Sequence, residues 1–462
     1  MKESRRGGGR RRCLRGAALG LLAAAMAAAC SRPPAPAASE PPRNVLLILV
    51  DTLRADHLSA YGYPRSTSPS LDRLAAASLF FRQARSQAAC TFPSVNSILT
   101  GRYPMRFLGQ PGGLMGIPDS AQPLAAIFAA RGFATAAVSA SPIVRVTPSR
   151  FNPHGGFGRG FEHFDETCLW READCVTRRA LAWLRHRPAG KPFFLYLHYM
   201  DPHDPYQPPP TWQRRFAGPY AGKEWVAQGD PLPLQTMIHA GGPKVDLTRD
   251  DLQHLLDLYD DEIAYFDSSL GRLLDQLDKR GLARDTVVAL VADHGEQFLE
   301  HGDVKHCRGA WEAETRIPLA VRIPGRAAQR IDSPVEVVAL APTLLDAVGI
   351  SPSGLDFEAA SLLAGPPADG VAKSSQGPFR SATDGRYKLI YDMAKGVMAL
   401  YDLRVDPQEH HDVAAQHPDR VAALREPLYA WLRRTEGHVA SPKSLEAAQE
   451  AEKQLRALGY IQ

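Results

Sequence analysis

Three apolar runs of the chain end in side chains that can bind a metal ion. The runs NVLLILVD, PFFLYLHYMDPH and TVVALVADHGE end in Asp51, in His203, and in Asp293 with His294. Each run is typical of a buried parallel strand whose polar residues begin where the strand stops. Two aspartates and one histidine suit a divalent ion such as Zn²⁺ or Mn²⁺, with Ca²⁺ as an alternative. The competing interpretation is that the acidic residues only cap the loops and helices that follow.

A metal ion at this place would acidify an alcohol beside it and turn it into a nucleophile. The segment TFPSVNSILTG supplies a candidate, because Pro93 is typical of a first helical turn and Thr91 lies just ahead of it. The amide groups at such a helix start also bind phosphate or sulfate. The alternative is that Thr91 or Ser94 is only the N-cap of the helix.

Helical segments separate these runs, so strands and helices alternate along the chain. The clearest are SPSLDRLAAASLFF, AQPLAAIFAARG and the long stretch 250–281. This alternation predicts an α/β fold with a mostly parallel sheet between helices, with ligands at the carboxyl ends of the strands. The acidic cluster Asp260, Asp261 and Glu262 is expected to be a polar face of the long helix and not a metal site.

Short motifs in a fixed order resemble those of the sulfatase family of the alkaline phosphatase superfamily. They are NVLLILVDTLRADHLSAYGY, SPSLDRLAAAS, TFPSVNSILTGRYP, KPFFLYLHYMDPHDPY, VADHGEQFLEHG, YKLIYD, LYDLRVDPQE and LRALGY, from about Asn44 to Tyr460. The resemblance implies an alkaline-phosphatase-like α/β fold with a small C-terminal α+β subdomain. It also implies a hydrolase or transferase that acts on sulfuric or phosphoric esters.

The resemblance puts the nucleophile position on Thr91. Family sulfatases carry there a cysteine or serine that is oxidised to formylglycine, followed two residues later by proline and four residues later by arginine. Here Pro93 fits, Val95 occupies the arginine position, and Cys90 is one residue out of register. A threonine nucleophile resembles instead the phosphoethanolamine and glycerol-phosphate transferases and some phosphodiesterases of this superfamily. A threonyl ester must be resolved by attack on its central atom, which phosphorus tolerates well.

By the same resemblance, one divalent metal ion is held by four residues: Asp51, Thr91, Asp293 and His294. Thr52 stands where many sulfatases have a second aspartate. The smaller number of carboxylates favours Zn²⁺ or Mn²⁺ over Ca²⁺.

Two further histidines, His203 and His306, are expected to contact the nonbridging and leaving oxygens of the ester, and one can act as general acid. Weaker candidates for the site are His198, His301, Glu296 and Glu300. The two glutamates either orient metal-binding histidines or are simply solvated acids.

The turn-rich segment 204–246 is either a lid over the substrate pocket or a plain surface excursion.

The chain start predicts export. The formal net charge is +4, yet seven basic residues and one acidic residue fall in the first fifteen, so the remainder sums to −2. A near-neutral body argues against nucleic acid as the main partner. The run GAALGLLAAAMAAA then leads to Cys30, which predicts a signal peptide over 1–30, of lipoprotein type or with ordinary cleavage. A lipid anchor at Cys30 would place the protein in a bacterial periplasm or outer membrane, in contact with envelope lipids or glycans.

The remaining sequence is divided into a proline-rich tether over 31–43, a catalytic domain over 44–350 and a C-terminal subdomain over 351–462. Segments such as RYKLIYD predict a small antiparallel sheet in the last part, followed by a helix near HPDRVAALREPLYAWLRR.

Export permits disulfides. Cys168 and Cys175 are close enough in sequence to close a small loop, and Cys90 and Cys307 either pair across the site or stay reduced.

Three functions therefore remain open. The favoured one is cleavage or transfer of a phosphoryl group through Thr91. The second is hydrolysis of a sulfuric ester on a sulfated glycan or small molecule. The third is a catalytically silent binding lipoprotein, against which the retention of three costly polar ligands argues.

Overall fold

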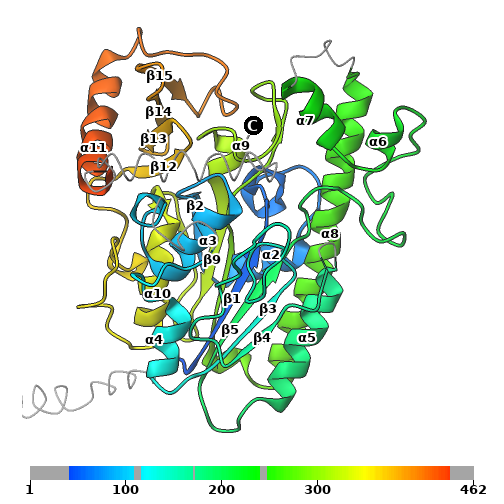
Figure 1. Ribbon diagram of the computed structural model, residues 1–462, viewed down its shortest axis with the longest axis vertical. Coiled ribbons are helices and arrows are strands. Elements are labelled where there is room, and N and C mark those ends of the chain that lie inside the picture. Colours follow the sequence, from blue (N-terminus) through cyan, green and yellow to red (C-terminus); the bar gives the residue numbers. More distant parts are fainter. Residues whose placement is uncertain (1–40, 109–115, 170–171, 240–246, 437–462) are drawn as a thin grey trace, which may run out of the picture. The chain divides into compact units, whose positions relative to one another are not determined.

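The computed structural model describes residues 41–108, 116–169, 172–239 and 247–436 (Figure 1). The predicted signal peptide, Cys30, most of the tether and the LRALGY motif lie outside these residues. The described residues, from Pro41 onward, form one compact unit. None of the helices in the described part combines the length and apolar composition that crossing a membrane requires.

The core of the unit is a nine-stranded sheet. Its strands are β1 (Asn44–Val50), β2 (Leu79–Arg85), β3 (Ala134–Ser139), β4 (His163–Asp165), β5 (Phe193–Tyr199), β6 (Thr286–Ala292), β9 (Arg316–Arg322), β10 (Gln329–Ile331) and β11 (Val335–Glu336). The order is β10-β2-β9-β6-β1-β5-β3-β4, with β11 beside β2, and only β9 runs antiparallel to its neighbours. The predicted mostly parallel α/β sheet is confirmed.

The three apolar runs lie side by side in the middle of this sheet. Strand β1 pairs in parallel with β5 and β6, and Val50 lies opposite Tyr199 and Ala292. All residues of these strands are buried, as expected for strands covered on both faces. This register brings Asp51 and Asp293 out of adjacent strand ends at the same level.

Helices cover both faces of the sheet. They are α2 (Pro69–Ala76), α3 (Thr91–Thr100), α4 (Leu124–Ala130), α5 (Ala173–His186), α6 (Glu224–Ala227), α7 (Leu232–His239), α8 (Arg249–Lys279), α9 (Glu312–Thr315), α10 (Leu340–Ala347) and α11 (Pro418–Glu436). Helices α2 and α5 pack against α8, whereas α3 packs against α4 and α10 (Figure 1). A capping box of Thr248 and Asp251 begins the long helix α8.

Two apolar segments are helical over only part of their length. The segment SPSLDRLAAASLFF, expected to be helical, is helical only to Ala76, and its last apolar residues begin strand β2. The segment PVEVVALAPTLLDAVGI contains strand β11, and its helix α10 covers only Leu340–Ala347. Short apolar runs do not distinguish a buried helix from a buried strand by periodicity alone.

The acidic residues expected on the polar face of α8 do not face solvent. Asp260, Asp261 and Glu262 are all fully buried. Asp261 accepts a hydrogen bond from the backbone N–H of Phe216, at 2.8 Å, and Glu262 accepts one from the backbone N–H of Gln207, also at 2.8 Å. These carboxylates therefore anchor the segment after residue 204 to α8.

A four-stranded antiparallel sheet follows the main sheet in sequence, as predicted. It consists of β12 (Ala372–Gln376), β13 (Phe379–Thr383), β14 (Tyr387–Asp392) and β15 (Val397–Asp402), and α11 packs against it. Strand β12 also contacts the loop before α3, where the backbone N–H of Ser375 donates to the carbonyl oxygen of Gln87 at 3.0 Å. A two-stranded ribbon of β7 (Gln297–Phe298) and β8 (Val304–Lys305) carries the loop after β6.

Candidate active site

Asp51, Asp293 and His294 form a buried group, called here the strand-end cluster. One ligand atom from each lies within 4.8 Å of those from the other two. The Nε2 of His294 is 3.7 Å from Asp51 Oδ1 and 3.4 Å from Asp293 Oδ2. All three follow β1 or β6 directly, so the parallel register of these strands brings them together.

The strand-end cluster has the chemistry of a cation site. Asp51 Oδ1 and Asp293 Oδ2 are buried and accept no hydrogen bond from a described residue. Burial raises the pKa of Asp293 to about 6, and the neighbouring Asp51 adds to this effect. Burial also acts to raise the pKa of Asp51, but the hydrogen bond from His198 and the nearby His203 and His294 together outweigh it, and the pKa is lowered. A divalent cation would relieve the cost of two close buried carboxylates, and the donor set fits Zn²⁺ or Mn²⁺.

Thr91 is the first residue of α3 and faces the strand-end cluster. Its hydroxyl oxygen lies 3.2 Å from His294 Nε2, and the residue is only 4% exposed. Ser94, one turn further on, donates its hydroxyl hydrogen to the carbonyl oxygen of Asp293 at 2.7 Å. That bond joins α3 to the cluster and commits Ser94 to a structural contact, so Thr91 supplies the hydroxyl beside the strand-end cluster.

Cys90 forms a disulfide with Cys307, with 5.0 Å between the two Cα atoms. Of the two alternatives left open by the sequence, pairing across the site is therefore the one observed. The bond joins the residue before Thr91 to the residue after His306. Because its sulfur is bonded, Cys90 is not available for conversion to formylglycine. A second disulfide closes the small loop between Cys168 and Cys175.

A second group, called here the loop cluster, consists of His203, Asp204 and His306. Its ligand atoms also lie within 4.8 Å of one another. The ring centroids of His203 and His306 are 5.1 Å apart, and those of His306 and His294 are 4.5 Å apart, so the two clusters adjoin. The sequence suggested that His203 lies at the end of a strand. Strand β5 stops at Tyr199, however, so His203 lies in the turn that follows it.

Glu296 and Lys305 support the loop cluster. The carboxylate of Glu296 is 3.0 Å from His306 Nδ1, and the ammonium of Lys305 is 3.1 Å from Asp204 Oδ2. Burial, followed by the nearby Asp204, raises the pKa of Glu296 well above its ordinary value. Burial and the neighbouring histidines lower the pKa of His306, which favours a neutral imidazole. The role predicted for Glu296 as an orienting group agrees with this contact.

The weaker candidates divide between the site and its surroundings. His198 is buried in β5, where its Nε2 is 3.3 Å from Asp51 Oδ2 and its Nδ1 is 2.8 Å from the hydroxyl of Tyr196. His301 instead stacks on Trp311 at 3.7 Å. Glu300 forms an ion pair with Arg54, at 2.5 Å, and does not contact a described histidine ring of either cluster.

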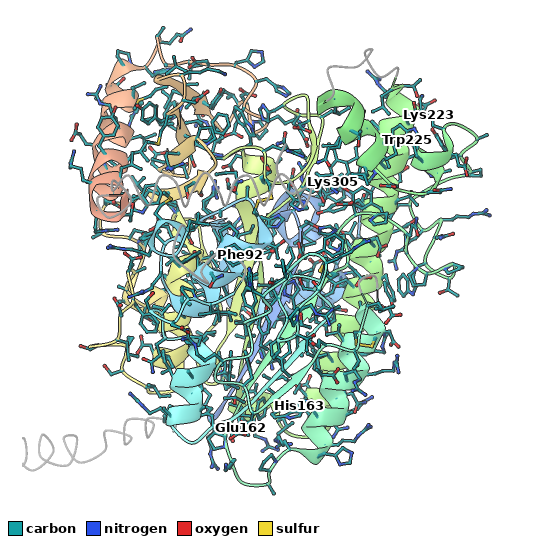
Figure 2. The ribbon with its side chains drawn as sticks, viewed as in Figure 1. Phe92, Glu162, His163, Lys223, Trp225 and Lys305 are labelled. Carbon is teal, nitrogen blue, oxygen red and sulfur yellow. A yellow bond between two sulfur atoms is a disulfide. The ribbon has the colours of Figure 1, made fainter. Side chains whose placement is uncertain are left out.

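Two site residues were not singled out from the sequence: Asp204 and Lys305. Each is the chain neighbour of a predicted site histidine, in DPHDPY and in VKHC. Adjacency was the available signal, but it does not show on which side of the loop each side chain lies. Lys305 in β8 and Phe92 in α3 lie toward the carboxyl ends of the central strands. Glu162 and His163, at the start of β4, lie at the other end of the sheet (Figure 2).

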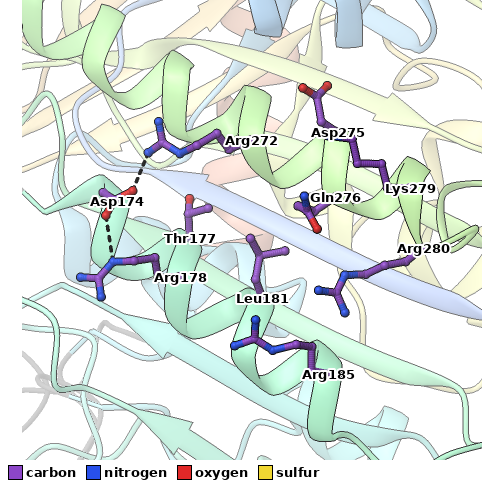
Figure 3. Close-up of a pocket in the computed structure, with 10 residues that line it drawn as sticks. All are labelled: Asp174, Thr177, Arg178, Leu181, Arg185, Arg272, Asp275, Gln276, Lys279 and Arg280. Carbon is purple, nitrogen blue, oxygen red and sulfur yellow. Dashed lines mark hydrogen bonds and ion pairs between the residues drawn. The ribbon is translucent and has the colours of Figure 1, made fainter.

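A separate groove of about 410 Å³ lies between α5 and α8 (Figure 3). Its lining includes Arg178, Arg185, Arg272 and Arg280, and Arg272 forms an ion pair with Asp174 at 2.7 Å. No residue of either cluster lines it. The groove is therefore distinct from the candidate active site.

The sulfatase family model matches residues 43–350. This chain belongs to the sulfatase family. It is 28% identical to human iduronate 2-sulfatase over 345 residues, which cover 62% of this chain and 60% of that protein. The chain thus matches somewhat less than two thirds of that sulfatase's length.

Two solved structures show the same fold as this sulfatase-family chain. One was determined with its substrate D-glucosamine-2-N,6-O-disulfate, and it matches with a TM-score of 0.69 and 20% identity over 87% of this chain and 99% of that one. The other is the phosphonate monoester hydrolase of Agrobacterium radiobacter, with a TM-score of 0.66 and 22% identity over 85% and 96% of the two chains. At these identities the likeness establishes the fold and leaves the substrate open.

Proposed function

We propose that this chain is an exported metalloenzyme that cleaves or transfers esters through Thr91, with phosphoryl substrates favoured over sulfuryl ones. One observation carries the proposal: the Thr91 hydroxyl lies 3.2 Å from His294 in the strand-end cluster, while Cys90 is bonded to Cys307. The helix start that presents the nucleophile in this family therefore offers an unmodified threonine.

Four residues would hold the metal ion: Asp51, Thr91, Asp293 and His294. When bound, a divalent ion supplies Lewis acidity that favours the ionised form of an adjacent alcohol. The chain's own residues then set the geometry. The bond from Ser94 to the Asp293 carbonyl fixes α3, and Thr91 is held at its first turn.

The chemistry that these groups can perform is a double displacement. The Thr91 oxygen forms a bond to phosphorus as the bond from phosphorus to the leaving alcohol breaks, and the alcohol departs with one proton. His203 can provide that proton, because the lowered pKa of His306 keeps that ring neutral, and the proton lost by Thr91 restores the balance. Water or an acceptor alcohol then attacks the threonyl ester, which returns Thr91 to its hydroxyl form.

Phosphorus is favoured because an ordinary threonine has no second hydroxyl with which to expel sulfate. Val95 also occupies the position of the arginine that accompanies formylglycine in sulfatases. The Agrobacterium phosphonate monoester hydrolase shows that this fold is used on phosphorus esters.

The test is a set of aryl esters assayed with added Mn²⁺ or Zn²⁺: a phosphate diester, a phosphate monoester, a phosphonate monoester and a sulfate. We expect turnover of at least one phosphorus ester and a mass increase on the Thr91 peptide after brief incubation. Turnover of the sulfate alone, or a peptide without any adduct in an active enzyme, would contradict the proposal.

Hydrolysis of a sulfuric ester is the second candidate. It is supported by the similarity to iduronate 2-sulfatase and by the structural neighbour solved with a disulfated glucosamine. The same assay extended to sulfated glycans would detect it as release of inorganic sulfate. A catalytically silent binding protein would show neither product, and it would show the same metal content with and without Asp293→Ala.

Export and a lipid anchor at Cys30 belong to the same proposal. The two disulfides support an oxidising compartment, because such bonds do not persist in most cytosols. The substrate would then be an ester of an envelope lipid or glycan, reached from the membrane surface. Labelling cells with a palmitate analogue tests the anchor: wild type should carry the label, and Cys30→Ser should not.

A further inference from the structure

We infer that the basic surface around the start of β1 docks on an anionic lipid membrane, so that the candidate active site faces away from that membrane. This surface, called here the entry patch, consists of seven side chains: Arg43, Arg185, Arg187, Lys191, Lys279, Arg280 and Arg284. The inference rests on the proposed function, because it concerns how an exported enzyme anchored at Cys30 is oriented.

Hydrogen bonds of Arg43 bring the three segments of the entry patch together. Its backbone N–H donates to the carbonyl oxygen of Asp285 at 3.1 Å, and its guanidinium donates to the carbonyl oxygen of Gly190 at 3.2 Å. Asp285 lies in the turn after α8, and Gly190 lies in the turn after α5. These two helices pack side by side (Figure 1), so the chain enters β1 between their ends.

The entry patch is the basic part of a body that is otherwise acidic. The segments 41–44, 185–191 and 275–285 carry the seven basic side chains and three acidic ones, which gives +4 with neutral histidine. Residues 16–462 together sum to −2, which leaves −6 for the residues outside these segments. An anionic surface would therefore attract this end of the body and repel the rest of it.

The groove between α5 and α8 shows that the patch cations are not neutralised within the fold. At the end of the groove away from β1, Asp174 pairs with Arg178 at 2.8 Å and with Arg272 at 2.7 Å (Figure 3). Its other end is lined by three cations that are exposed and form no ion pair with a described residue: Arg185, Lys279 and Arg280. This end of the groove offers a place for negatively charged headgroups.

Arg187 adds a further cation at the same end. Burial and the nearby Arg280 lower the pKa of the Arg187 guanidinium, as expected where two cations lie close together without a carboxylate partner. The other patch members, Arg43, Lys191 and Arg284, are exposed and likewise form no ion pair within the described residues. An external anion would relieve this repulsion.

Stabilisation of helix ends does not explain the whole patch. Basic residues in the last turn of a helix interact favourably with the partial negative charge at its carboxyl end, which accounts for Arg185 and Lys279. Arg43, however, precedes a strand, and Lys191 lies in a turn. A surface that faces an anionic partner accounts for all of these positions.

The tether makes this end of the molecule the one that the proposed anchor holds near the membrane. Pro41 follows Cys30 by eleven residues. An extended chain spans about 3.5 Å per residue, so the entry patch stays within about 40 Å of the membrane. Stable attachment commonly combines a lipid chain with a basic patch, and each basic residue close to an anionic leaflet strengthens binding about fivefold.

Docking through the entry patch determines which substrates the enzyme reaches. Asp51 and Asp293 follow the opposite ends of β1 and β6, and each strand is seven residues long. At about 3.3 Å per residue, the strand-end cluster lies about 23 Å from the docked end. This orientation favours a glycan or a soluble ester over a lipid of the same leaflet as substrate.

The experiment maps the docked surface by amine labelling. The purified full-length protein is mixed with vesicles of phosphatidylcholine, alone or with phosphatidylglycerol, then labelled with an amine-reactive reagent and analysed by peptide mass spectrometry. On the anionic vesicles we expect labelling of Lys191 and Lys279 to fall at least about threefold relative to the neutral ones, with Lys395 of the C-terminal sheet unchanged. An anchored protein binds both kinds of vesicle, so the difference reports the entry patch and not the anchor.

A triple variant and a matched control make the assignment specific. The variant removes three cations at one end of the groove: Arg185→Gln, Lys279→Gln and Arg280→Gln. The control removes three exposed cations from the C-terminal part: Lys395→Gln, Arg404→Gln and Arg433→Gln. We expect Lys191 to be labelled equally on both kinds of vesicle in the variant and to stay protected in the control. Circular dichroism melts establish that both are folded.

Two outcomes would overturn the inference. One is equal labelling of Lys191 and Lys279 on neutral and anionic vesicles in wild type. The other is equal protection by soluble glycerol phosphate at the same headgroup concentration, which would assign the patch to a free phosphate ester.

Failure of the inference is separable from failure of the proposed function. A protein without a lipid anchor would float with the anionic vesicles alone, and protection without turnover of any ester would refute only the proposed function. Turnover of a soluble aryl ester should be equal in wild type and in the triple variant, because the entry patch lies at the end of the sheet opposite the candidate active site.

Discussion

The strand-end cluster and the loop cluster adjoin, but different forces position them. Asp51, Asp293 and His294 follow two paired strands, so the backbone register of the sheet fixes their spacing. The residues of the loop cluster lie in two turns that no ladder joins to each other within the described residues. Local contacts hold them instead: the Cys90–Cys307 disulfide, the bond between Glu296 and His306, and the pair of Lys305 with Asp204.

This difference teaches that the two halves of one site can fail independently. Damage to the strand-end cluster should remove the chemistry and leave the fold intact, because the sheet does not depend on the ligands. Loss of the disulfide or of the local contacts should leave the strand-end cluster able to bind its metal ion, while the loop cluster loses its orientation. The following substitutions test that separation, from the largest expected effect to the smallest.

Asp293→Asn should have the largest effect. We expect turnover to fall by about 10³-fold or more, since a metal ligand is lost. The metal-free variant should nevertheless melt at a higher temperature than metal-free wild type at pH 8, because burial and Asp51 raise the pKa of Asp293 and its ionised form is costly. Assays and melts of both proteins check this. A lower melting temperature of the metal-free variant would show that the sheet does rely on this ligand.

Glu296→Gln should weaken the loop cluster alone. Loss of an outer carboxylate typically costs about 10- to 100-fold in activity or metal affinity, and we expect a fall in kcat of that size with the strand-end ion retained. Glu300→Gln is the matched control, because Glu300 pairs with Arg54 and contacts neither cluster among the described residues. Steady-state kinetics with metal analysis distinguish the two. Equal losses of kcat in both variants would mean that Glu296 acts only through stability.

Removal of each disulfide in turn compares the one beside the candidate active site, Cys90–Cys307, with the one in a separate loop, Cys168–Cys175. The double variant Cys90→Ser with Cys307→Ser should lose about 10-fold in activity, whereas Cys168→Ser with Cys175→Ser should retain it. Loop entropy predicts destabilisation by about 5 kcal/mol for the first pair, which spans 217 residues, and about 2 kcal/mol for the second, which spans 7.

The measurement is kcat at a temperature where both double variants are folded, alongside urea unfolding. Treatment of wild type with a dithiol reductant should reproduce the loss seen in the first pair, as each disulfide becomes two thiols. Full activity of the first double variant would show that Glu296 and Lys305 suffice to hold the loop cluster.

Gln376→Ala should have the smallest effect. Its side chain accepts a hydrogen bond from the Ala89 backbone N–H at 3.2 Å and donates one to the Cys307 carbonyl at 3.3 Å, so it bridges the two loops that the disulfide joins. Each such bond contributes about 1 kcal/mol, and we expect a loss of that order with a change in kcat of less than about threefold. If kcat fell further than in the Cys90→Ser, Cys307→Ser variant, Gln376 would be the main contact that holds these two loops together.

The sequence predicts the strand-end cluster well because strand periodicity and parallel pairing carry its geometry. The runs before Asp51 and Asp293 are mostly apolar and fully buried, and their pairing follows from the α/β pattern. The loop cluster is less predictable, since turn conformations determine which neighbours converge. His203 was singled out because it ends an apolar run, and His306 by resemblance, whereas Asp204 and Lys305 were not singled out. The burial of Asp260 to Glu262 was missed because helical amphipathicity does not report what later packs on the polar face.

The contact of strand β12 with the loop before α3 has a consequence for the evolution of the chain. The segment that matches the family model ends at residue 350, yet the loop leading to Thr91 is bonded to Ser375 and Gln376, beyond that end. A gene shortened to the matched region would encode every proposed catalytic side chain and lack part of what holds the nucleophile. Recombination between relatives should therefore be tolerated only when residues 86–90 and β12 are inherited from the same parent.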